Sequence, residues 1–205
     1  SSLNAVVGRG GLLHPIPGGI YRINEGMKAD LLAAKYGEHA SNLGALIADT
    51  FAREFGIPAF IADPVVVDEL EDVARVSGHK LFKRISIFHA LNQKAVARRF
   101  AKERGINYED ITLIVAHLGG GISVGLHRKG RVIDVNQALS GEGPFSPERS
   151  GTLPAGDLAR LCFSGQYTLQ EVLKMITGKG GMVSFLGTNN MRDIEHMRDQ
   201  GNKEA

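Results

Sequence analysis

Cysteine is almost absent from this sequence: Cys162 is the only one among 205 residues. A single cysteine excludes an internal disulfide and a metal site built from several cysteines, and it is typical of proteins kept in a reducing cytosol. The sequence also has no apolar run long enough to cross a membrane and no recognisable signal peptide. We therefore expect a cytoplasmic protein without a membrane partner.

An excess of charge of one sign is lacking as well. The formal net charge is +2 and no long basic run occurs, so nothing indicates a nucleic-acid partner. Internal repeats and low-complexity tracts are also missing. Apolar residues make up 43% of the chain, which is ample for a core, and the length allows one large domain or two small ones.

The most informative stretch is the run of three glycines, Gly119–Gly121. A β-branched apolar run over residues 111–115 precedes it, and strand-like segments over 122–127 and 131–135 follow it. We therefore expect the glycines in a tight turn between strands, where positive φ and close approach of a ligand are possible. Their N–H groups would form a nest for an anion such as phosphate. A tight hairpin without a ligand is the alternative.

Two common nucleotide-binding motifs do not fit these glycines. A P-loop needs Gly-Lys-Ser/Thr and a following helix, and a dinucleotide fingerprint needs G-x-G-x-x-G at the start of a helix. A phosphate-binding β-hairpin remains, which is the device of the actin-like ATPase fold.

The N-terminal part predicts an α/β arrangement. Strands are expected over 3–7 and 57–62, with helices over 28–36 and about 43–55. The second helix carries large apolar residues on one face at the spacing of a core-facing stripe. These residues are Leu43, Leu46, Ile47, Phe51 and Phe55.

Three polar residues occupy positions where functional side chains are common. Asp63 follows the second strand, where open α/β sheets place ligands, although it could instead cap a turn or helix. His89 begins a helix expected to run to Arg104, and it could be a cap or a catalytic group. Arg149 lies in residues 140–154, a loop too rich in glycine and proline for regular structure. Helices over 157–163, 168–176 and about 191–198 complete the chain.

Five short motifs, matching in order and spacing, resemble those of the acetokinase family. His117–Val124 resembles its phosphate hairpin, and Glu148–Gly151 its Thr-Arg-Ser-Gly loop. Phe88–Ala90 resembles its Phe-His-Gly motif, Ala62–Pro64 its Phe-Asp-Thr, and Asn190–Ile194 its adenosine-side Asp-Phe-Arg-Asp-Ile. The resemblance covers essentially the whole chain and implies an α/β protein with the actin-like ATPase (ribonuclease H-like) fold.

Within that family the departures resemble butyrate kinases. Acetate kinases carry Asn in place of Gly120, Thr-Ser-His in place of Leu91–Gln93, and Arg-Val-Val-His-Gly-Gly in place of Val6–Gly11. The last difference moves the arginine of that motif to Arg9. With Gly120, only backbone N–H groups can contact phosphate at that position.

The resemblance implies that ATP and butanoate give ADP and butanoyl phosphate, with Mg²⁺ as cofactor. Acetate, propionate or branched-chain fatty acid kinases are alternatives within the enzyme class. Outside it, a non-catalytic actin-like ATP-binding module is the alternative. The expected partners are therefore ATP and a small carboxylate, with a homo-oligomer implied by the family's tendency to dimerise.

The resemblance also implies roles for individual residues. Arg149 and His89 would stabilise the moving phosphoryl group, and Asp63 would help to place Mg²⁺, directly or through water. Arg9 would bind the carboxylate, and His39 resembles a further active-site histidine. The residues expected to meet phosphates and nucleoside are His117, Gly119, Gly120, Gly121, Asn190, Met191 and Arg192.

We expect residues 1–63 to be the C-terminal part of a first actin-like domain and residues 64–205 to be most of a second. The fold's first phosphate hairpin has no match in residues 1–205, and neither have the family's magnesium-binding glutamate and last adenosine-side glycines. The resemblance thus implies a chain truncated at both ends, with negligible activity on its own and an open sheet edge.

Overall fold

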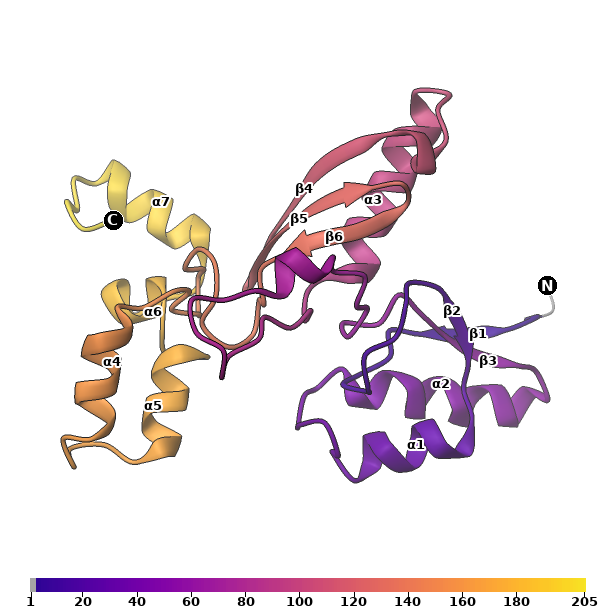
Figure 1. The fold of residues 1–205 in the computed structure, drawn as a ribbon, viewed down its shortest axis with the longest axis horizontal. Helices are drawn as coiled ribbons and strands as arrows, with labels where there is room; N and C mark the ends of the chain where they lie inside the picture. The colour runs from indigo at the N-terminus through magenta and orange to yellow at the C-terminus, as the bar shows by residue number, and fades with distance from the viewer. Residues whose placement is uncertain (1–2) are drawn as a thin grey trace. The chain divides into compact units, whose positions relative to one another are not determined.

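The computed structural model describes residues 3–205 (Figure 1), which form two compact units. Unit 1 takes in the described residues up to Val115 together with Gly125–Val135, and unit 2 takes in Ala116–Val124 and Asn136–Ala205. This division by contacts does not coincide with the boundary expected after residue 63. The assignment of residues 1–63 and 64–205 to two domains of the actin-like fold stays a prediction.

A small mixed sheet forms the first layer of unit 1. Strand β1 (Val6–Gly8) pairs in parallel with β3 (Ala59–Ala62), which pairs antiparallel with β2 (Ile20–Arg22). The strand expected over 57–62 is confirmed, and the one expected over 3–7 begins later. Strand β2 was not predicted, because three residues are too few to show a period.

Two helices lie on one side of this sheet (Figure 1). Helix α1 (Glu25–Leu32) begins three residues before the expected start, because the Asn24 side chain caps it by accepting the Met27 N–H at 2.9 Å. Helix α2 (Asn42–Phe55) matches the expected bounds and ends at Gly56, whose φ of 64° makes the left-handed cap.

The predicted core face of α2 is wrong. Small residues, Ala45, Ala48 and Ala52, are buried against the sheet, whereas Leu43, Ile47, Phe51 and Phe55 are about half exposed. The reason is the close approach of α2 to β1: a Cβ on Gly8 would overlap the carbonyl oxygen of Gly44. Only small side chains fit between backbones that lie so close together.

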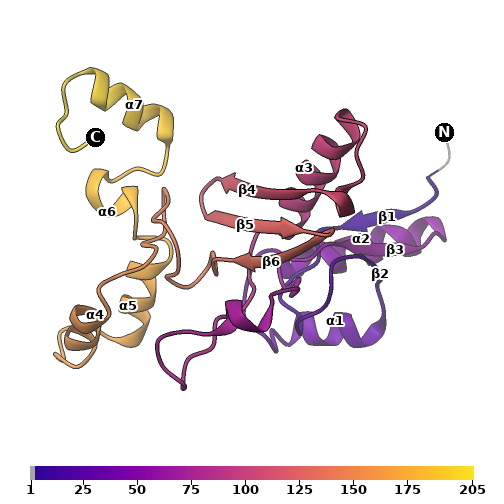
Figure 2. The same cartoon turned by 45° about the horizontal axis from the view of Figure 1, so that its top comes forward.

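The second sheet contains β4 (Thr112–Leu118), β5 (Ile122–Arg128) and β6 (Arg131–Val135), side by side in that order (Figure 2). The predicted strands and the glycine turn between the first two are confirmed, and Lys129 and Gly130 turn the chain between β5 and β6 with φ of 52° and 74°. Helix α3 (Ala90–Glu103), also predicted, packs on this sheet through Ala97 and Ala101. Single 3₁₀ turns lie at Asp72–Arg75 and Tyr108–Asp110.

Unit 2 carries the remaining helices, α4 (Ala155–Cys162), α5 (Leu169–Ile176), α6 (Met182–Leu186) and α7 (Met191–Asp199). The sequence predicts all of them except α6, which follows Gly180 and Gly181. The long loop before α4 has neither helix nor strand, as expected, apart from one bridge between Arg149 and Thr177. None of the helices among the described residues is long and apolar enough to span a membrane.

Candidate phosphate site and the residues around it

The turn Gly119–Gly121 joins β4 to β5, and the Gly119 N–H donates to the Gly121 carbonyl at 3.2 Å. None of the three glycines has φ in the left-handed region, so positive φ is not what requires glycine here. The need for glycine is steric instead. A Cβ on Gly121 would overlap Nη1 of Arg149, and one on Gly119 would lie 2.9 Å from Nε2 of His117, whereas Gly120 has 3.4 Å of space.

Arg149 is therefore held directly over the backbone of the turn. Its Nη1 donates to the carbonyl of Ala138. Its own N–H donates to Oγ of Ser146 at 3.1 Å, and the Ser146 hydroxyl donates to the carbonyl of Gly120 at 2.6 Å. One hydrogen bond, from Ser146 to Gly120, thus joins the loop of Arg149 to the glycine turn.

The guanidinium of Arg149 has a donor that no described residue uses. Its Nε is buried and has no hydrogen-bond partner among residues 3–205. Burial lowers the pKa of Arg149, opposed in part by the negative charge of Glu148, but a guanidinium stays charged in proteins. A buried charge with an unused donor is costly unless an anion meets it. The turn and Arg149 are therefore a candidate site for an anionic group.

The predicted nucleoside residues lie at the start of α7, in the same unit. Asn190 caps the helix by accepting the Arg192 N–H at 3.1 Å, and Met191 and Arg192 are exposed. Their neighbour Asn189 donates to Oε2 of Glu148 at 3.2 Å. This bond ties the start of α7 to the loop that carries Arg149.

Asp63 lies in unit 1, at the end of β3, and is 4% exposed. Its Oδ1 accepts the Gly19 N–H at 2.8 Å and its Oδ2 accepts from Arg98 at 2.7 Å. Groups of three or more His, Cys, Asp or Glu able to hold a metal are absent from the part of the chain that the structure describes. Asp63 and its neighbours among the described residues therefore do not fit a Mg²⁺ site whose ligands are all protein side chains.

The other predicted residues of unit 1 are more exposed than Asp63. His89 is the N-cap residue of α3 but makes no side-chain capping bond, so the capping alternative is not supported. His39 is exposed, and its Nδ1 lies 2.8 Å from Oγ of Ser41. Arg9 is exposed directly after β1. The structure thus brings together His117, the glycines and Arg149, and leaves four predicted residues in unit 1.

Sequence reasoning missed Ser146, although its spacing to Arg149 held a signal. A serine three residues before an arginine in a loop can accept that residue's N–H, as Ser and Thr commonly do in turns. It also missed Arg98, Lys94 and Glu69, which surround Asp63 and Gly18 and are described below.

Two solved structures share the fold of this chain. The solved structure of the acetate kinase from Porphyromonas gingivalis matches with a TM-score of 0.80 at 19% identity, over 98% of this chain and 53% of that one. The acetate kinase from Entamoeba histolytica matches with a TM-score of 0.71 at 17% identity, over 98% and 54%. The protein thus has the α/β, actin-like fold of these kinases, as predicted.

The family follows from the sequence itself. The model of the acetokinase family matches residues 74–205, and the chain belongs to this family. Butyrate kinase 2 of Clostridium acetobutylicum is 62% identical over 204 residues, which are 100% of this chain and 57% of that protein. A probable butyrate kinase of Listeria innocua is 58% identical over 100% of this chain and 58% of its own length. The chain spans less than two thirds of these relatives.

Proposed function

We propose that the full-length protein transfers the γ-phosphoryl group of ATP to a short-chain carboxylate, and that butanoate is its acceptor. Family membership and the butyrate kinase relatives support the reaction class. The observation that carries the proposal is the guanidinium of Arg149, which is held over the turn Gly119–Gly121 with a buried, unused Nε–H. Such an arrangement suits a phosphoryl group whose negative charge is spread over its three outer oxygens during transfer.

The chemistry explains why donors rather than a base are needed. A carboxylate is already ionised near neutral pH and attacks without losing a proton. Both reactants are anions, so the site must offset their repulsion and hold them in line. Arg149 and His89 are the proposed donors to the moving phosphoryl group, and His117 with Gly119, Gly120 and Gly121 would line the phosphate path.

The remaining assignments are proposals of the same kind. Arg9 would bind the acceptor carboxylate, with His39 beside the substrate, and Asn190, Met191 and Arg192 would meet the nucleoside. Asp63 would act on Mg²⁺ through water, because both of its oxygens already have protein partners. We further propose a cytoplasmic location and a homo-oligomer.

The test is acyl phosphate formation by the full-length protein, trapped with hydroxylamine. With ATP present, butyrate, acetate, propionate and isobutyrate are compared at matched concentrations. Butyrate should give the highest kcat/KM. A higher value for another acid would overturn the acceptor assignment alone. Nucleotide binding without hydroxamate from any acid would instead support a non-catalytic ATP-binding module.

A further inference from the structure

Asp63 is held in a backbone conformation that aspartate rarely adopts. Its φ is 35°, in the left-handed region, and such strain persists only where the surroundings fix it firmly. The fixing contacts come from two residues. Gly19 exchanges two hydrogen bonds with Asp63, accepting its N–H and donating to Oδ1, each at 2.8 Å. Arg98 of α3 donates to Oδ2 at 2.7 Å.

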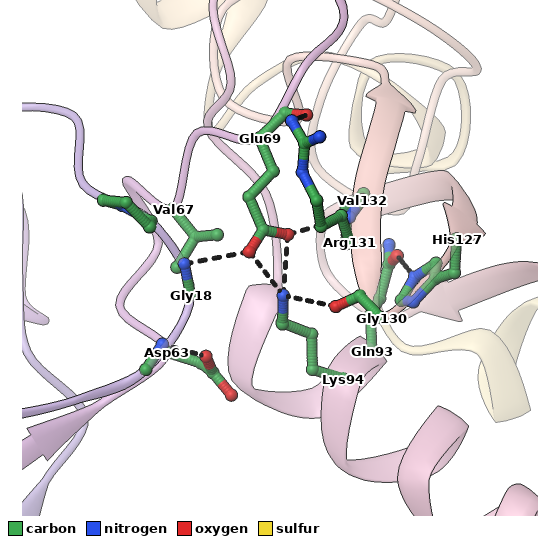
Figure 3. Close-up of polar contacts among 12 residues, drawn as sticks. Gly18, Asp63, Val67, Glu69, Gln93, Lys94, His127, Gly130, Arg131 and Val132 are labelled. Atoms are coloured by element: carbon green, nitrogen blue, oxygen red, sulfur yellow. Dashed lines mark hydrogen bonds and ion pairs between the residues drawn. The ribbon is translucent and has the colours of Figure 1, made fainter. Parts of the chain in front are cut away.

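Gly18, which precedes Gly19 in the same turn, is also bound by a carboxylate (Figure 3). The Gly18 N–H donates to Oε1 of Glu69 at 3.0 Å, and Lys94 of α3 contacts the two oxygens of Glu69 at 2.8 and 2.6 Å. The Glu69 and Lys94 side chains are only 9% and 2% exposed. Glu69 also accepts the Val132 N–H at 2.8 Å, and Lys94 donates to the Gly130 carbonyl at 3.3 Å.

Two consecutive amides are therefore each bound by a carboxylate, and each carboxylate is paired with a cation from α3. Lys94 and Arg98 are four residues apart, so they lie on one face of the helix. We call this arrangement the double clamp; it consists of Gly18, Gly19, Asp63 and Glu69 with these two cations. A Cβ on Gly18 would lie 2.5 Å from Nζ of Lys94, so the turn fits only because residue 18 is glycine.

The clamp acts on the same helix that presents His89. The start of α3 is fastened to the segment after Asp63: the Phe88 N–H donates to the Val65 carbonyl at 3.1 Å, and the Ser86 hydroxyl donates to the Val67 carbonyl at 2.7 Å. Together with the clamp, these bonds fix α3 to residues 63–69 both at its start and at its middle. The placement of His89 relative to Asp63 depends on these contacts.

We propose that Arg98, Lys94 and Glu69 are positioning residues, which hold the Gly18–Gly19 turn and Asp63 in register with the His89 end of α3. The inference rests on the proposed function, in which Asp63 and His89 take part in phosphoryl transfer. None of the three positioning residues needs to touch a substrate. Small misplacements of catalytic groups lower rates strongly, so loosening the clamp lowers kcat.

The first test substitutes Arg98, whose side chain is 49% exposed, and folding of the variant is checked by circular dichroism. In the full-length protein, Arg98→Met should lower kcat about 10- to 100-fold with little change in KM for ATP. Amide exchange in a peptide covering residues 15–22 should become about 10-fold faster or more, because the Asp63 anchor of the turn is weakened. Arg98→Lys keeps the charge, so its kcat and its exchange rate over residues 15–22 should lie closer to the wild-type values.

The matched control is Arg75→Met. Arg75 lies in the same unit and pairs at 2.7 Å with Asp68, the residue before Glu69. Within residues 3–205 its side chain bonds only Asp68 and the Leu70 carbonyl, and neither the Gly18–Gly19 turn nor α3. Loss of this pair should leave kcat and exchange of residues 15–22 near the wild-type values. A kcat loss equal to that of Arg98→Met would mean general destabilisation and overturn the inference, as would a normal kcat in Arg98→Met.

The second test addresses the buried pair. Removing one partner would leave a lone buried charge and risks unfolding, so Lys94→Met and Glu69→Gln are combined. The double variant should show faster exchange over residues 15–22 and a lower kcat. Exchange as slow as in the wild type would show that Lys94 and Glu69 do not position the turn.

The proposed function and the positioning role of the double clamp can be disproved separately. A wild-type full-length protein that forms no acyl phosphate overturns the proposed function and, with it, the catalytic part of this inference. Normal wild-type activity with unchanged kcat in both clamp variants overturns the positioning role and leaves the proposed function standing.

Discussion

The Arg149 guanidinium occupies the space in which a side chain at Gly121 would begin. Any residue larger than glycine at position 121 must therefore displace Arg149. We expect Gly121→Ala to lower kcat about 100-fold, since a misplaced guanidinium no longer meets the transferring group. Gly120→Ala should lower kcat much less, because a Cβ there has 3.4 Å of space. Steady-state kinetics of both variants test this, and equal losses would contradict the steric reading of the turn.

Removal of Arg149 itself should affect the transition state more than the bound substrate. We expect Arg149→Ala to lower kcat by roughly 10³ or more, by analogy with other arginines that act on phosphoryl groups, while KM for ATP changes far less. Arg149→Lys serves as the charge-conserving control and should recover part of kcat. Near-normal kcat in Arg149→Ala would remove this residue from the mechanism.

A buried histidine should make stability depend on pH. His127 is fully buried, with Nδ1 2.7 Å from the Tyr108 hydroxyl and Nε2 3.0 Å from Oε1 of Gln93. Burial, and then the positive charge of Lys94, lower the pKa of His127 to about 4 from the usual 6.5. Between these values the unfolded chain binds more protons than the folded one, so stability falls as the pH falls.

From pH 7.5 to pH 5.0 this histidine should remove about 2 kcal/mol from the free energy of unfolding. Urea titrations at both pH values measure the difference. His127→Gln should shrink it, whereas His14→Asn, at an exposed position, should leave it as in the wild type. An undiminished pH dependence in His127→Gln would assign the effect to other groups.

Helix α2 offers a test of which face carries stability. Ala48 is 2% exposed and packs near the β1 backbone, so Ala48→Leu should destabilise by about 1–3 kcal/mol through overpacking. Phe51 is 52% exposed, and Phe51→Ser should change stability by about 0.5 kcal/mol or less. Chemical denaturation measures the stability of both variants. A larger loss of stability in Phe51→Ser than in Ala48→Leu would support the buried face expected from the sequence.

That same helix shows where sequence reasoning fails. The bounds of α2 were predictable, because Gly56 and Pro58 mark its end and apolar spacing marks its body. The buried face was not, because it depends on how closely α2 approaches Gly8, some 35 residues away in the chain. Periodicity reports which residues share a face, and tertiary packing selects the face that is covered.

The candidate site was likewise predictable only in part. The strands around the glycine turn and the helix after His89 follow from local patterns, and the motifs pointed to Arg149. The steric reason for Gly121 did not follow from them, because it depends on a loop 28 residues later in the chain. The pairing of Arg98 with Asp63 was equally hidden, since two charges of opposite sign in distant elements carry no local signature.

The distribution of the proposed substrate contacts over the two units has a kinetic consequence. His117, Gly119–Gly121, Arg149 and residues 190–192 all belong to unit 2, whereas Arg9 and His39 belong to unit 1. Apart from the phosphoryl group, which His89 and Asp63 of unit 1 would also serve, the nucleotide contacts and the acceptor contacts lie in different units. Each ligand is therefore expected to have its own binding equilibrium. Initial-rate patterns are therefore expected to show random order of addition, with either substrate able to saturate the protein before the other arrives.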